Sequence, residues 1–189
     1  MKKDALRILV IVLGLAEVVM LAHWMDDHRQ NRDAPISEER LYVDGATAKR
    51  LTHQGAKQMA AVAVGRAQEA GIAIAVAVTD AGGHLVVLER MDGGRFHTVH
   101  SATTKAVCAA SNKRPTSAQG AQAQPLDVAH AIGLALAAGP ERWTAMEGGF
   151  PVIVEGECIG GIGVSGGDWE TDARIAREAV EAIGAAWSA

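Results

Sequence analysis

The most constraining feature of this chain is a run in which large and small apolar residues alternate strictly, 72–79 (IAIAVAVT). Successive side chains of a β-strand point to opposite faces, so this alternation predicts a strand with its large residues on one face. The other face carries only alanines and one threonine, so another element must pack closely against it. We therefore expect a strand that is covered on both faces, inside a layered domain.

Two segments have the pattern of β-hairpins, in which two short apolar runs are separated by a glycine-containing turn. In the first, the strand 72–79 is followed by the turn Asp80–Gly83 and a partner strand at 84–91. In the second, a strand at 152–154 turns at Gly156 into a strand at 158–165. Hairpins, in contrast to β-α-β repeats, predict an antiparallel sheet.

Helices are predicted between and around these hairpins. Thr52 is a good N-cap for a helix over 53–70, which ends at Gly71. Further helices are expected at 96–112 and 126–138, and a last one begins near Asp168 or Thr171 and runs to the C-terminus. The predicted fold class is α+β, an antiparallel sheet flanked by helices, plus one N-terminal transmembrane helix.

The N-terminal segment 5–25 is long and apolar enough to cross a hydrocarbon layer of about 30 Å. Lys2 and Lys3 precede it and two aspartates follow it, so the positive-inside bias leaves the rest of the chain outside the cytoplasm. A cleavable signal peptide is the alternative, but the small-x-small sites near its end are poor. We expect an anchor at 1–26, a polar tether at 27–50 and a domain at 51–189, in the periplasm of a bacterial inner membrane.

Glu17 lies near the middle of the predicted span, where a carboxylate is costly unless it is protonated or paired. This favours a polar partner on a neighbouring transmembrane helix over a tolerated, protonated side chain. The net charge of −4 and the lack of a basic run argue against nucleic acid as a partner. Cys108 and Cys158 form either a disulfide or two buried thiols, and no metal site has the spacing that zinc needs.

The predicted helix 96–112 carries an unusual polar stripe. The solvent-facing side of a surface helix usually carries long charged side chains. This stripe instead holds small polar residues, two imidazoles and a thiol, which favours an interface or a pocket. His97 and His100 lie on one face of the helix and are candidate ligands of a metal or haem iron, against the plainer interpretation as surface residues. The stripe consists of His97, His100, Ser101, Thr104, Cys108 and Ser111, with Lys105 at its edge.

Two other features have plainer interpretations. Asp80 precedes two glycines and is expected to accept backbone hydrogen bonds in its turn, with His84 beside it as a separate candidate ligand. The glycine-rich run 160–167 lacks the ending of a phosphate-binding loop and is better explained by close packing of backbones. The sequence shows no nucleophile elbow and no pair of carboxylates with an evident catalytic task, so no catalytic residue is predicted.

Taken together, the motifs resemble those of the GlcG/HbpS family, which also occurs as the C-terminal domain of PduO-type proteins. The similarity extends from about Leu51 to Ile183, and its specificity lies in the joint order and spacing of the motifs. The matching segments are 78–85 (VTDAGGHL), 90–93 (RMDG), 104–106 (TKA), 112–116 (NKRPT), 148–151 (GGFP), 160–167 and 171–172.

The resemblance implies an antiparallel sheet flanked by helices, symmetric oligomers, and binding of haem or a related tetrapyrrole in some members. It places candidate ligand-binding residues on the motif positions, whereas His97 and His100 match no motif position. The motif candidates are Asp80, His84, Lys105, Arg114, Gly148 and Gly149.

Two functions are weighed on these grounds. The first is a membrane-anchored, periplasm-facing domain that binds haem or another small ligand and has no catalysis of its own. The second is a non-catalytic accessory or scaffold subunit of a membrane-bound dehydrogenase or another respiratory complex, held through residues 5–25 and Glu17. A weaker third interpretation is a small enzyme or redox sensor that uses Cys108, His97 or Lys105.

Overall fold

The structure is a computed structural model that describes residues 42–44, 49–120 and 122–188. The two hairpins and the four helices predicted after residue 50 are all present. In chain order the elements are β1 (Tyr42–Asp44), β2 (Lys49–Leu51), α2 (His53–Glu69), β3 (Ala75–Asp80), β4 (Leu85–Arg90), α3 (Phe96–Asn112), α4 (Val128–Ala138), β5 (Gly149–Val154), β6 (Glu157–Ser165) and α5 (Trp169–Glu181).

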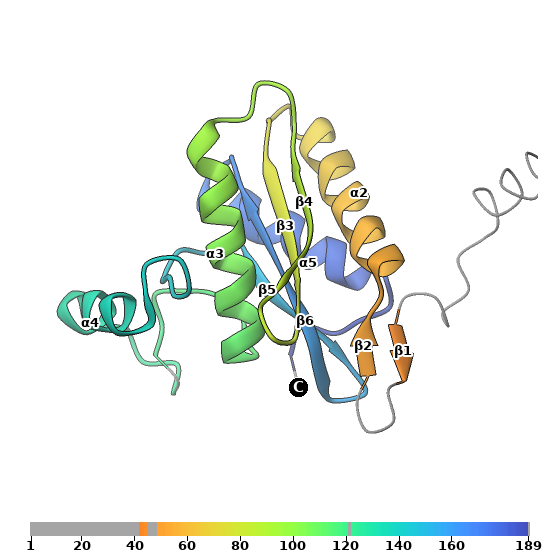
Figure 1. Cartoon of the computed structure of the whole chain (residues 1–189). Helices are drawn as coiled ribbons and strands as arrows, with labels where there is room; N and C mark the ends of the chain where they lie inside the picture. Colours follow the sequence, from red (N-terminus) through yellow and green to blue (C-terminus); the bar gives the residue numbers. More distant parts are fainter. Residues whose placement is uncertain (1–41, 45–48, 121, 189) are drawn as a thin grey trace, which may run out of the picture. The chain divides into compact units, whose positions relative to one another are not determined.

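The main sheet has the strand order β4-β3-β6-β5, and every neighbouring pair is antiparallel. Helix α3 packs on one face of this sheet, while α2 and α5 pack on the other (Figure 1). The prediction of an α+β fold with an antiparallel sheet flanked by helices is therefore confirmed.

The alternation that predicted β3 has the expected structural effect. Its small residues, Ala75 and Ala77, are buried in a cluster with Ala102 and Ala106 of α3. The strand begins at Ala75 and not at Ile72, because the N–H of Ile72 donates to the carbonyl of Ala67 and completes the C-terminal cap of α2. Gly71 supplies the left-handed residue of that cap, with φ of 68°.

Helix α3 and strand β6 approach so closely that no side chain fits between their backbones. A Cβ atom on Gly163 would overlap the carbonyl oxygen of Ala102, and one on Gly161 would overlap that of Ala106. Glycine is otherwise unfavourable inside a strand, so its presence here reflects this contact. The glycine-rich run in β6 is thus a packing feature, as its sequence context predicted.

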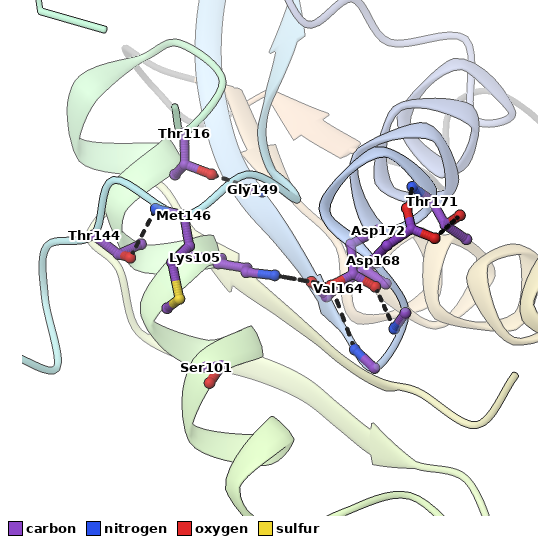
Figure 2. Close-up of polar contacts among 12 residues, drawn as sticks. Ser101, Lys105, Thr116, Thr144, Met146, Gly149, Val164, Asp168, Thr171 and Asp172 are labelled. Carbon is purple, nitrogen blue, oxygen red and sulfur yellow. Dashed lines mark hydrogen bonds and ion pairs between the residues drawn. The ribbon is translucent and has the colours of Figure 1, made fainter. Parts of the chain in front are cut away.

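A buried ion pair joins α3, β6 and α5 (Figure 2). The ammonium of Lys105 donates to the carbonyl of Val164 at 2.8 Å and to the carboxylate of Asp172 at 3.1 Å. The two side chains are only 4% and 5% exposed. Asp172 also accepts from the backbone N–H groups of Gly166 and Gly167, so both charges are fully engaged inside the fold.

Helix α4 is the exception to the layered packing. Asp127 caps its N-terminus, yet none of its residues is buried. Three apolar side chains spaced four apart, Val128, Ile132 and Leu136, are 74%, 56% and 76% exposed. A helix this short is marginal in water on its own, and exposed apolar patches are typical of interaction surfaces.

The predicted anchor lies outside the described residues, and none of the described helices is long and apolar enough to span a membrane. Of the predicted tether 27–50, the structure describes residues 42–44 and 49–50. There it contains β1 and part of β2, which pair antiparallel, with Tyr42 opposite Leu51 and Asp44 opposite Lys49. The described residues 42–44 and 49–50 thus precede residue 51, the start of the predicted domain.

Replacing Asp172 with alanine is expected to destabilise the domain strongly, because the Lys105 ammonium would stay buried without its counter-charge. Removal of one partner of a buried pair costs about 3–5 kcal/mol. Urea unfolding followed by circular dichroism measures this loss. The matched control is Glu170→Ala, an exposed acid in the same helical turn, expected to change stability by about 0.5 kcal/mol or less. A loss at Asp172→Ala no larger than the control's would contradict the structural role.

Candidate functional site

The polar stripe predicted along α3 is only partly exposed. Thr104, Lys105 and Cys108 are buried, whereas His97, His100 and Ser111 face outward. Helical periodicity missed this because α3 is enclosed on two sides. The sheet covers one side, and the segment before β5 covers another, where the Cys108 thiol donates to the carbonyl of Thr144 at 3.5 Å. The stripe is therefore not one continuous exposed face, and its outward residues alone are available to an interface or a pocket.

His97 and His100 lie on the exposed side of α3. The ring of His97 contacts the ring of Phe96 edge-on, with centroids 5.6 Å apart. Within residues 42–44, 49–120 and 122–188, no three His, Cys, Asp or Glu side chains gather where they would hold a metal ion. The two imidazoles therefore remain candidate ligands without a supporting cluster around them.

The two cysteines are free thiols. Burial raises the pKa of Cys108, with small opposing contributions from the Thr144 backbone and the Arg114 charge. Burial likewise raises the pKa of Cys158. A raised pKa keeps a thiol protonated and unreactive, so neither side chain has the environment of a nucleophile or redox sensor.

Lys105, Gly148 and Gly149 come together in the interior, around the buried ion pair. A Cβ atom on Gly148 would lie 3.0 Å from the Lys105 ammonium nitrogen, and Gly148 has a φ of 103°. The N–H of Gly149 donates to the hydroxyl of Thr116 at 2.9 Å. This cluster fixes the start of β5 against α3. The sequence motifs identified its members but not Asp172 and Thr116 as their partners.

Asp80 and His84 form a hydrogen-bonded pair at the turn between β3 and β4. One carboxylate oxygen of Asp80 accepts from the backbone N–H groups of Gly82 and His84, at 2.9 Å each, as expected for this turn. Nδ1 of the His84 ring lies 3.2 Å from both carboxylate oxygens. Because an ionised carboxylate only accepts hydrogen bonds, Nδ1 carries a proton, and in the neutral ring Nε2 then has the free lone pair.

Hydrogen bonds to the Asp80 carboxylate stabilise its ionised form. Partial burial raises the pKa of its carboxyl, but hydrogen bonds from the His84 backbone, the His84 ring and the Gly82 N–H outweigh that effect. The pKa therefore lies below its usual value, and the carboxylate holds the imidazole in one tautomer at neutral pH.

His84 stands at the rim of a groove of about 770 Å³ between the β3–β4 turn, α3 and the segment after α4. We call this the His84 groove. The ring of His84 is 82% exposed, so a ligand has access to Nε2. Two residues that sequence reasoning missed complete one wall, Arg142 and Trp143. The sequence did contain a signal for them: a tryptophan lies next to an arginine in a polar segment, and the chain is only 4% aromatic.

Arg114, the remaining candidate, lies in a different place. It lines a separate cavity of about 530 Å³ beneath α4, together with His130 and Trp143 among others. The structure thus distributes the predicted residues over four locations. Asp80 and His84 share a groove, Lys105 and the two glycines form an interior cluster, Arg114 lines its own cavity, and His97 and His100 lie on the open side of α3.

Comparison with known proteins agrees with this architecture. A family model described as "Haem degrading protein HbpS-like" matches residues 51–181. Protein GlcG of Escherichia coli K12 is 33% identical over 115 residues, which cover 61% of this chain and 81% of that protein. A solved structure described as a PduOC:heme complex has a TM-score of 0.64 and 28% identity, and covers 74% of this chain and 99% of that one.

The expectation of a protein that is not an enzyme needs correction. The corrinoid adenosyltransferase PduO of Citrobacter freundii, which its name identifies as an enzyme, is 28% identical over 163 residues. The match covers 84% of this chain but only 48% of that protein, so the chain spans about half the length of this relative. The motifs, the fold and the family match over residues 51–181 lead to one conclusion. This chain belongs to the HbpS-like family.

Proposed function

We propose that the domain binds haem, or a related metal-containing tetrapyrrole, in the His84 groove, with Nε2 of His84 as the ligand to the metal. The observation that carries this proposal is the Asp80–His84 pair at 3.2 Å. A metal-ligating histidine commonly donates its other ring N–H to a carboxylate, which fixes the tautomer and orients the ring. Nε2 has no hydrogen-bond partner in the part of the chain that the structure describes.

The other groups around the groove suit the same ligand. Val107, Ala138 and Trp143 offer apolar surface for the flat face of a macrocycle, and the guanidinium of Arg142 offers a partner for a carboxylate side chain. The volume of about 770 Å³ lies in the range of roughly 300–1,000 Å³ that is usual for small-molecule sites. The family description and the haem complex of the PduOC structure support the same class of ligand.

Within this site each part of the chain has a distinct task. Asp80 holds the imidazole in its ligating tautomer, and the turn hydrogen bonds hold Asp80. Trp143 and Val107 exclude water from one side of the groove. A bound haem iron would supply ligand exchange and electron-transfer chemistry there, tuned by the basicity that Asp80 lends to His84.

Haem titration of the full-length chain in mild detergent is expected to give a saturable shift of the Soret band. His84→Ala should weaken haem binding the most, because it removes the metal ligand. Asp80→Asn should weaken binding less, because the ring remains but loses its charged partner. Loss of the hydrogen-bond partner of a metal-ligating histidine typically costs about 10–100-fold in affinity, so the loss at His84→Ala should exceed this range.

His97→Ala and His100→Ala are the matched controls, since both imidazoles are exposed on α3 and outside the groove. They are expected to bind haem as the parent chain does. Loss of the Soret shift in either control, with His84→Ala unaffected, would place the ligand on α3 and contradict the proposed site.

We further propose that residues 5–25 anchor the chain in a bacterial inner membrane with the domain in the periplasm. The apolar run and the charges that flank it support this topology. The role of a subunit in a larger assembly, either a homo-oligomer or a membrane complex, is a second candidate function. It is favoured by the exposed apolar stripe of α4, Val128, Ile132 and Leu136, and by Glu17 within the apolar run.

Affinity purification of the tagged chain from membranes tests both ideas. Deletion of residues 1–26 should release the chain from the membrane fraction, and protease added to spheroplasts should digest the domain of the intact chain. Glu17→Leu should remain in the membrane, since it only removes a charge, but should lose partners that the parent retains. A deletion variant that stays with the membrane would contradict the anchor, and an unchanged set of partners in Glu17→Leu would contradict pairing through Glu17.

A further inference from the structure

The cavity beneath α4, which we call the Arg114 cavity, is separate in its chemistry from the His84 groove. Asn112 and Trp143 border both, so these two side chains form the partition between them. The segment that follows α3 and residues of α4, among them His130 and Leu134, line the remaining sides of this open cavity. Its volume of about 530 Å³ suits a ligand smaller than a tetrapyrrole.

Arg114 provides the charge of this cavity. One of its terminal nitrogens donates to the carbonyl of Gly120 at 2.6 Å, which fixes the position of the guanidinium. A guanidinium has five N–H donors and is always protonated, so donors remain available to a ligand. Among the described residues, Arg114 forms no ion pair with a carboxylate. The side chain is half-buried, which strengthens its attraction for an anion.

Among the described side chains that border the cavity, none forms an ion pair with Arg114. The acidic residue among them, Asp127, directs one oxygen to the N-terminus of α4, where it accepts from the N–H groups of Ala129 at 2.7 Å and His130 at 3.4 Å. Trp143, Leu134 and Leu126 contribute flat and aliphatic apolar surface. The cavity therefore combines one fixed, unpaired cation with an aromatic wall.

We propose that the Arg114 cavity is a second ligand site and that it takes a small aromatic carboxylate. The carboxylate pairs with the guanidinium of Arg114, in the two-point geometry that arginine favours, and the ring packs against Trp143 and Leu134. This site differs from the proposed haem site in its charged residue, Arg114 instead of His84, although the two share Asn112 and Trp143 as a common wall.

Calorimetric titration of the full-length chain with benzoate tests this inference. Benzamide, which has a similar shape and no charge, is the control ligand. Benzoate should bind saturably and at least tenfold more tightly than benzamide. Arg114→Gln should remove that preference. Arg114→Lys should retain part of it, since lysine keeps the positive charge but cannot donate two parallel hydrogen bonds to a carboxylate. The control Arg174→Gln, at an exposed arginine of α5, should bind benzoate as the parent does.

Three results would overturn the inference. They are the absence of saturable benzoate binding up to about 10 mM, equal affinity for benzoate and benzamide, and an unchanged preference in Arg114→Gln. If Arg142→Gln abolished benzoate binding and Arg114→Gln did not, the carboxylate would belong to the His84 groove and the second site would not exist. The comparison of Arg114→Lys with the parent protein decides the matter if Arg114→Gln fails to fold.

Discussion

The contact between α3 and β6 is the constraint on which the rest of this domain depends. Alanines on the helix and glycines on the strand bring two backbones together without an intervening side chain, so neither Gly161 nor Gly163 has room for a Cβ atom. That contact sets the depth at which α3 lies on the sheet. It brings Lys105 within reach of Asp172 at 3.1 Å, and it places the C-terminal half of α3, from Thr103 to Asn112, alongside the turn that carries His84.

Most of the fold was predictable because its signals are local. The large–small alternation of β3, the capping residue Thr52 and the Gly71 stop each specify their own element through steric or hydrogen-bonding needs. The structure confirms the bounds of α3 as predicted. The exposure of α4 was not predictable, because its apolar residues are those of a buried helix and yet none of its residues is buried.

The candidate site was predictable only in part, and the reason is physical. Asp80 and His84 are four residues apart in one turn, so their pairing follows from local geometry. Lys105 has a chemically suggestive side chain, but its role depends on Asp172, which lies 67 positions further along the chain. Arg142 and Trp143 reach the His84 groove only through the tertiary arrangement of the segment after α4, and no spacing in the sequence specifies that arrangement.

A crystal structure of the full-length chain loaded with haem tests the central claim, that the Asp80–His84 pair forms the metal-binding side of the groove. The account predicts iron bonded to Nε2 of His84, with Nδ1 still beside the Asp80 carboxylate and the macrocycle against Trp143. Iron bonded to His97 or His100 on the open face of α3, or to no residue of the His84 groove, would contradict it.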